Sequence, residues 1–233
     1  MPRPPRADEA GGLYHVLNRG NLRATIFHNQ ADYLAFEQIL HEGLAASRVE
    51  LYSYLLMPNH YHLVLRPMVH GEMSRFMKWI GGTHTMRYHA HHRTSGLGHV
   101  YQQRYKSFPI QADEPFFAVC RYVERNALRA GLVRRAEDWR WSSLWRWLQR
   151  PEPAPQLLSA WPVPRLPNWV ERVNAALSER ELEAIRKCAH RGQPLGDEKW
   201  IKATARRLGL EATLRPRGRP KSEKDVKRSQ KET

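Results

Sequence analysis

The chain has 233 residues, and its 38 Lys and Arg against 23 Asp and Glu give a formal net charge of +15. A hydrophobic fraction of 41% excludes a wholly disordered chain, and the lack of a long apolar run or an apolar leader excludes a transmembrane helix and a signal peptide. Because its two isolated cysteines support neither a disulfide framework nor a zinc knuckle, we expect a cytoplasmic protein with a polyanionic partner; basicity that serves only solubility is the alternative.

The first predicted elements are a strand and a helix. Residues 13–17 have the pattern of a short strand, which ends at the basic turn 18–21. Asn29 or Asp32 is placed to cap a helix whose apolar residues recur at helical spacing, at Tyr33, Phe36, Ile39, Leu40 and Leu44.

A strand pair and a second helix follow. The strands are expected at 49–57 and 61–65, and the short Pro58-Asn59 connection between them predicts an antiparallel pair. The helix is expected over 73–91, weakened or bent by Gly81-Gly82. His89, His91 and His92 do not keep a metal-site spacing, so we expect them to end this helix on the surface.

A third strand–helix pair completes the predicted core. The strand is expected at 101–110, and Asp113 and Gly131 are placed to begin and end the helix. The order of the elements predicts an α+β fold, a ferredoxin-like antiparallel sheet flanked by helices, with a C-terminal helical extension and a basic tail.

The chain divides by composition into four parts. Residues 1–150 hold the predicted core, and 151–167 form a Pro-rich linker. Residues 168–210 read as a helical extension, and 211–233 as a basic tail that is disordered alone. The tail contains Pro-Arg-Gly-Arg-Pro, which resembles an AT-hook; a tail that binds phosphates without preference is the alternative.

A pair of histidines is the first candidate for chemistry. On a strand, His60 and His62 share one face, while Tyr61, Leu63 and Leu65 share the other. The two imidazoles then lie about 7 Å apart along the strand, a separation that one cation can bridge. The alternative is a pair of histidines on a solvated face. Taken alone, the His-x-His pattern favours this alternative.

The third predicted helix supplies complementary groups. Tyr122 and Asn126 lie one turn apart at the edge of its apolar stripe, and Arg129 continues their row. With the histidine pair, they suggest a tyrosine nucleophile beside Mg²⁺ or Mn²⁺, because two imidazoles and an amide oxygen leave positions for a phosphate and water. A free phenol has a pKa of about 10, so a nearby cation would favour ionisation. A boundary tyrosine with a wet hydroxyl is the alternative.

These residues carry a resemblance to a known group of enzymes. Residues 57–62 are similar to the HUH motif (His, bulky hydrophobe, His) of the single-tyrosine transposase superfamily, and residues 121–133 resemble its tyrosine helix. Three more stretches resemble one branch, the REP-associated tyrosine transposases: 18–21, 101–107 and 141–143. The match covers about residues 12–148, which makes residues 1–150 the expected single-strand DNA transposase domain.

The resemblance implies a metal-dependent cleavage of single-stranded DNA near hairpins of repetitive extragenic palindromes. Tyr122 would attack a phosphodiester, leaving a 5′-phosphotyrosine link and a free 3′-hydroxyl. His60 and His62 would be metal ligands, and Asn126 would take the third position, which is often Gln in related insertion-sequence transposases. No small-molecule cofactor and no membrane partner are expected, and the oligomeric state is left open between monomer and dimer.

Basic and polar residues around these motifs are predicted to contact DNA. They are Arg19, Asn21, Arg104, Lys106, Arg129, Arg217 and Arg219. For Arg104 and Lys106, a solvated basic face is the alternative. The rival to the enzyme is a catalytically silent hairpin-DNA-binding protein, against which the joint presence of Tyr122 and the histidine pair argues. A histidine-triad hydrolase is set aside, because Val64 occupies the place of the further histidine.

Overall fold

A computed structural model describes residues 6–149 and 156–215 of the chain. The arginines of the AT-hook-like stretch, Arg217 and Arg219, lie outside the described residues.

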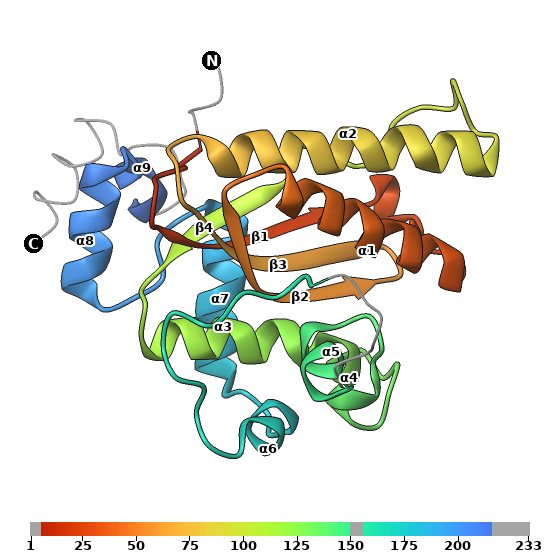
Figure 1. The fold of residues 1–233 in the computed structure, drawn as a ribbon. Helices are drawn as coiled ribbons and strands as arrows, with labels where there is room; N and C mark the ends of the chain where they lie inside the picture. Colours follow the sequence, from red (N-terminus) through yellow and green to blue (C-terminus); the bar gives the residue numbers. More distant parts are fainter. Residues whose placement is uncertain (1–5, 150–155, 216–233) are drawn as a thin grey trace, which may run out of the picture.

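One four-stranded antiparallel sheet forms the centre of the molecule (Figure 1). Its strands are β1 (Leu13–Arg19), β2 (Val49–Met57), β3 (His60–Pro67) and β4 (Lys106–Ile110), in the spatial order β2-β3-β1-β4. The order and the antiparallel pairing are those of a ferredoxin-like βαββαβ unit, so the predicted fold class is confirmed.

Two long helices, α1 (Gln30–Ala45) and α2 (Glu72–His92), cover one face of the sheet. Asn29 begins α1 as predicted, through a capping box in which it and Asp32 satisfy each other's backbone N–H groups. The expected weak point at Gly81-Gly82 does not interrupt α2, because the buried Phe76 and Ile80 anchor the helix against the core there.

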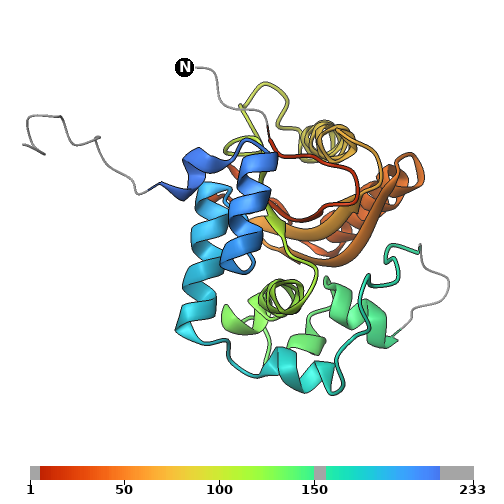
Figure 2. The ribbon, with the colours of Figure 1, turned by 90° about the vertical axis from the view of Figure 1, so that its left-hand side faces the viewer.

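The opposite face carries α3 (Glu114–Glu124), α4 (Asn126–Arg129) and α5 (Ser143–Gln149) (Figure 2). The single helix predicted from Asp113 to Gly131 is broken into α3 and α4 at Arg125. Gly131 still ends the helical run, because its φ of +71° is a backbone conformation that favours glycine.

The two faces of the sheet belong to separate apolar clusters. Tyr61, Leu63 and Leu65 pack under α1 and α2, as the alternation along the strand predicts. Val64 of β3 packs on the other face, against the cluster that includes Phe116 of α3. Since side chains alternate along a strand, His60 and His62 lie on the α3 face.

The strand predicted at 101–110 is shorter than expected. Only Lys106–Ile110 forms regular β4, while Tyr101 makes an isolated bridge to Gly20. Residues 102–104 form a bend, since the N–H of Gln102 donates to the carbonyl of Arg19 and turns the chain across the end of β1.

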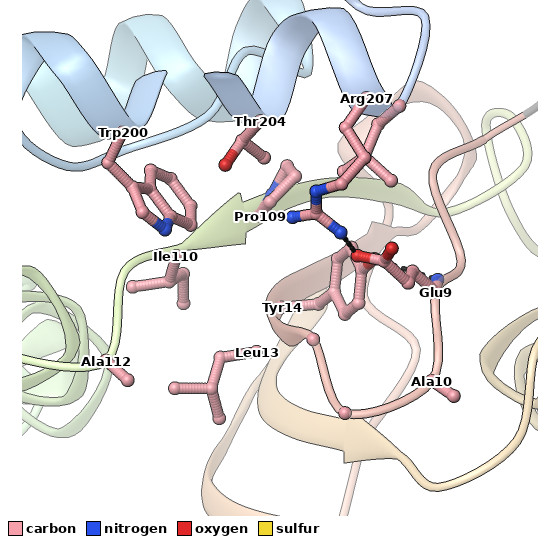
Figure 3. Close-up of a pocket in the computed structure, with 13 residues that line it drawn as sticks. Glu9, Ala10, Leu13, Tyr14, Pro109, Ile110, Ala112, Trp200, Thr204 and Arg207 are labelled. Carbon is pink, nitrogen blue, oxygen red and sulfur yellow. Dashed lines mark hydrogen bonds and ion pairs between the residues drawn. The ribbon is translucent and has the colours of Figure 1, made fainter. Parts of the chain in front are cut away.

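The C-terminal part contains α6 (Trp169–Asn174), α7 (Glu179–Arg191), α8 (Glu198–Arg207) and α9 (Glu211–Leu214), of which α6 and α7 bury apolar side chains in the cluster on the α3 face. Leu195 forms a parallel bridge with Ile110 at the edge of β4. Figure 3 shows α8 facing the start of the chain across a pocket of about 380 Å³, where Arg207 forms an ion pair with Glu9.

The division of the chain at 151–167 and 168–210 stays a prediction. The described part of the Pro-rich stretch nonetheless packs on the core: Leu157 is buried, the N–H of Ser159 donates to Leu51, and the indole of Trp161 donates to the carbonyl of Tyr52.

Candidate active site

The predicted site residues meet at the end of the sheet where β3 begins. His60 and His62 come from β3, and Tyr122 and Asn126 come from α3 and α4 on the same face. All four side chains line one pocket of about 500 Å³. The burial of Phe116, which packs α3 on the sheet, sets the distance between the two groups.

A chain of hydrogen bonds fixes the orientation of His62. The amide nitrogen of Asn126 lies 3.0 Å from His62 Nε2, and Arg129 donates to the Asn126 amide oxygen at 2.9 Å. Because the arginine occupies the oxygen, the amide nitrogen is the group that donates to His62. His62 therefore carries its lone pair on Nε2 and its proton on Nδ1, which lies 2.9 Å from Nε2 of His15.

Burial favours the neutral form of His15, His60 and His62. Burial lowers the pKa of His15 to about 3 and that of His60 to about 3, the latter aided by Arg19 and Arg129. Burial also holds the pKa of His62 well below its ordinary value, together with its histidine neighbours. Neutral imidazoles offer a lone pair, which is the form that metal ligation requires.

Tyr122 closes the site beside His62. The two ring centroids lie 5.9 Å apart in an edge-on arrangement, and the Arg129 guanidinium carbon lies 5.3 Å from the centre of the Tyr122 ring. The tyrosine is 8% exposed, and its hydroxyl makes no hydrogen bond within the described residues. A phenol held by its ring with an unengaged hydroxyl is suited to act as a nucleophile.

The walls of the pocket are cationic. The charged residues among those that line it are Arg19, Arg104, Lys106, Arg129 and Arg186, and no acidic residue lies in its described lining. Nε of Arg19 is buried and has no hydrogen-bond partner among the described residues. A buried donor of this kind calls for an acceptor, and a phosphate oxygen would supply one.

Of the seven predicted DNA contacts, four line this pocket, Asn21 does not, and Arg217 and Arg219 lie outside the described residues. The four that line it are Arg19, Arg104, Lys106 and Arg129. The bend at 102–104 also brings Gln103 into the lining. Asn21 does not line the pocket; it begins a 3-10 turn, Asn21–Arg23, and its N–H donates to the carbonyl of Val100.

Three site residues were not found by the sequence analysis. His15 lies on the same face of β1 as Leu17, and Leu17 pairs with His62 of β3, so His15 faces the site. The sequence contains no signal for this strand pairing. Arg186 and His190 of α7 line the pocket from the C-terminal extension. Their i, i+4 spacing shows a shared helix face, but not what that face covers.

The two imidazoles of the site can offer lone pairs to a divalent cation, and a hard cation would also need oxygen ligands. His60 Nδ1 lies 2.6 Å from the side-chain oxygen of Asn59, so its lone pair is on Nε2, as in His62. Asn126 presents its nitrogen to His62, and its oxygen is held by Arg129. To act as an oxygen ligand, the Asn126 amide has to turn over and leave Arg129.

The sequence profile described as "Transposase IS200 like" matches residues 10–126, just over half of the chain. The chain belongs to this family, and membership indicates a DNA-cleaving enzyme. No curated protein matches the chain.

Two solved structures resemble this one. The structure of a REP-associated tyrosine transposase bound to a REP hairpin matches with a TM-score of 0.53 and 18% identity, over 69% of this chain and 95% of that one. A candidate transposase of Deinococcus radiodurans R1 matches with a TM-score of 0.39 and 19% identity, over 53% and 96%. The first match confirms the fold, and with the family it bears out the resemblance seen in the sequence.

Within residues 6–149 and 156–215, no helix combines the length and the apolar character needed to cross a bilayer.

Proposed function

We propose that the protein cleaves single-stranded DNA beside a hairpin, in a metal-dependent reaction that passes through a 5′-phosphotyrosine link. Tyr122 is the nucleophile: its hydroxyl oxygen attacks the phosphorus, the bond to the 3′ oxygen breaks, and a free 3′-hydroxyl leaves. The observation that carries the proposal is the convergence of Tyr122, His62 and Asn126 in one cationic pocket.

His60 and His62 would hold the metal, with Asn126 as a third ligand once its amide oxygen is released. Mg²⁺ or Mn²⁺ suits such a mixed nitrogen and oxygen set. When bound, the ion would polarise the scissile phosphate and favour the ionised phenol. Arg129 links the two roles, because it holds the Asn126 oxygen and also lies over the Tyr122 ring.

Hairpin DNA is the proposed substrate because two observations agree. The pocket walls are cationic, and the structural relative of the same fold was solved with a REP hairpin. Phosphates of the single strand would contact Arg19, Arg104 and Lys106, and the cytoplasm is the proposed location. A silent hairpin-binding protein is the second candidate; the unengaged Tyr122 hydroxyl favours the enzyme.

Metal removal should abolish cleavage. We expect a labelled single-stranded hairpin oligonucleotide to give a denaturation-resistant protein–DNA adduct with Mg²⁺ or Mn²⁺, and none after chelation. His60→Ala should shift the metal titration to higher concentrations, because one imidazole ligand is lost. His99→Ala, which changes an exposed histidine, is the control. Hairpin binding without adduct or cleavage at any metal concentration would favour the silent protein instead.

DNA binding should depend on Arg186 of α7. Since it lines the pocket, Arg186→Ala should weaken single-strand binding roughly fivefold and reduce the slope of log K against log salt by about 0.7, the value for one lost phosphate contact. Arg180→Ala, at the exposed start of the same helix, is the matched control and should change neither quantity. Equal effects of the two substitutions would show that α7 contributes only general charge.

A further inference from the structure

A second cluster of metal-binding side chains lies outside the candidate active site. Asp32 in the first turn of α1 meets His91 and His92 in the last turn of α2. Each of the three offers one ligand atom, and these atoms all lie within 4.8 Å of one another. No metal was predicted for this histidine run, because its own spacing is not that of a metal site; the third member of the cluster, Asp32, is 59 residues away in the chain.

We propose that this cluster binds a zinc-class divalent cation, which joins the start of α1 to the end of α2. Two imidazoles and one carboxylate form a donor set that Zn²⁺, Co²⁺ and Ni²⁺ accept, with water completing a tetrahedral site. The proposal does not rest on the function proposed above, because no residue is shared between the two sites.

The geometry of the carboxylate is already suited to a ligand. One oxygen of Asp32 accepts the backbone N–H groups of His28 and Asn29, at 2.7 and 3.3 Å, which fixes the carboxylate in place. The other oxygen lies 3.1 Å from Nε2 of His92. Two ligand atoms on one tetrahedral zinc lie about 3.3 Å apart, given bonds of about 2.0–2.1 Å. His91 is exposed, so its side chain can turn to close the remaining distance.

The surroundings favour a cation there. The cluster lies between the C-terminal end of α2, whose unpaired carbonyl groups carry partial negative charge, and the first turn of α1, whose partial positive charge is offset by Asp32. The nearby Arg87 is neutralised by an ion pair with Glu42 at 2.7 Å. His28 lies beside His92, with the two rings tilted by 57° and their centroids 4.9 Å apart, while its Nε2 is engaged by the Tyr88 hydroxyl at 2.9 Å. The exposed His28 therefore borders the cluster with its Nε2 already engaged.

Such an ion would also act on the candidate active site. His92 ends α2, and the chain then runs through residues 93–100 to the bend at 102–104, which lines the catalytic pocket. An ion that holds the end of α2 on the start of α1 would therefore fix the position at which the connection through residues 93–100 begins.

The test uses the full chain carrying His60→Ala and His62→Ala, so that the other site cannot contribute. Co²⁺ is the spectroscopic probe, and Zn²⁺ is then titrated in competition. We expect one equivalent of Co²⁺ with the visible absorption of a tetrahedral ion, displaced by Zn²⁺, and a rise in melting temperature with Zn²⁺. In the same background, His91→Ala with His92→Ala should weaken binding at least about tenfold.

Two controls keep the outcome decisive. His99→Ala, an exposed histidine beyond α2, should leave binding unchanged. His91→Gln alone should weaken binding without unfolding the chain, because that side chain is exposed; circular dichroism checks the fold. The proposal is overturned if the parent background binds no Co²⁺, if the His91 and His92 variant binds as tightly as the parent, or if His99→Ala weakens binding equally.

Discussion

Tyr122→Phe is expected to abolish strand cleavage and the covalent adduct while leaving hairpin binding intact. The substitution removes only the hydroxyl, which makes no hydrogen bond within the described residues. The ring keeps its edge-on contact with His62 at 5.9 Å and its contact with Arg129. Loss of an attacking group typically costs on the order of 10⁴-fold or more in rate. We expect a fall of that size, with unchanged hairpin affinity and melting temperature.

The measurement is a denaturing gel of labelled hairpin oligonucleotide with Mg²⁺ or Mn²⁺, beside a binding titration in the same buffer. Tyr33→Phe is the matched control, because Tyr33 is also buried but packs on the α1 side of the sheet. It should cleave like the wild type. Cleavage that persists in Tyr122→Phe would move the nucleophile to another residue, and a matching loss of binding would make Tyr122 a binding residue only.

The sequence predicts the sheet well because its signals are local. The alternation around His60 and His62 sets their common face, and the Asn29 capping signal marks where α1 begins. The 101–110 strand was predicted too long, since the bend at 102–104 depends on a hydrogen bond to Arg19 that no local pattern reveals. Likewise, the break at Arg125 separates α3 from α4 although helix-forming residues lie on both sides.

The sequence predicts the motif residues of the candidate site. It does not predict the contacts between segments that are far apart in the chain. Spacing predicts that Tyr122 and Asn126 lie one turn apart, and both line the pocket although the helix breaks between them at Arg125. The contact between His15 and His62 depends on the register of β1 against β3, and Arg186 depends on where α7 packs. No single residue of the sequence indicates the register of β1 against β3 or the position at which the C-terminal extension packs. Only the structure shows these two features.

The largest loss of stability is expected from a buried ion pair that joins three elements. Glu37 of α1 accepts hydrogen bonds from the Tyr54 hydroxyl at 2.6 Å and from Arg146 of α5 at 2.8 Å. The Glu37 and Arg146 side chains are only 9% and 11% exposed. Glu37→Ala removes the carboxylate that both groups contact, although Arg146 keeps its hydrogen bond to the Tyr54 hydroxyl at 2.9 Å. Removing one partner of a buried ion pair costs about 3 kcal/mol or more.

Glu42→Ala on the same helix is the matched control. Its partner Arg87 is 44% exposed, and such surface pairs contribute about 0.5 kcal/mol. Both substitutions put alanine into α1, so the change in helix propensity is the same and cancels. Urea unfolding should therefore show a much larger fall in midpoint for Glu37→Ala. Adding Arg146→Met should recover part of that fall, because it removes the stranded charge; equal losses from both glutamates would mean that water reaches Arg146 and that the pair is not buried in solution.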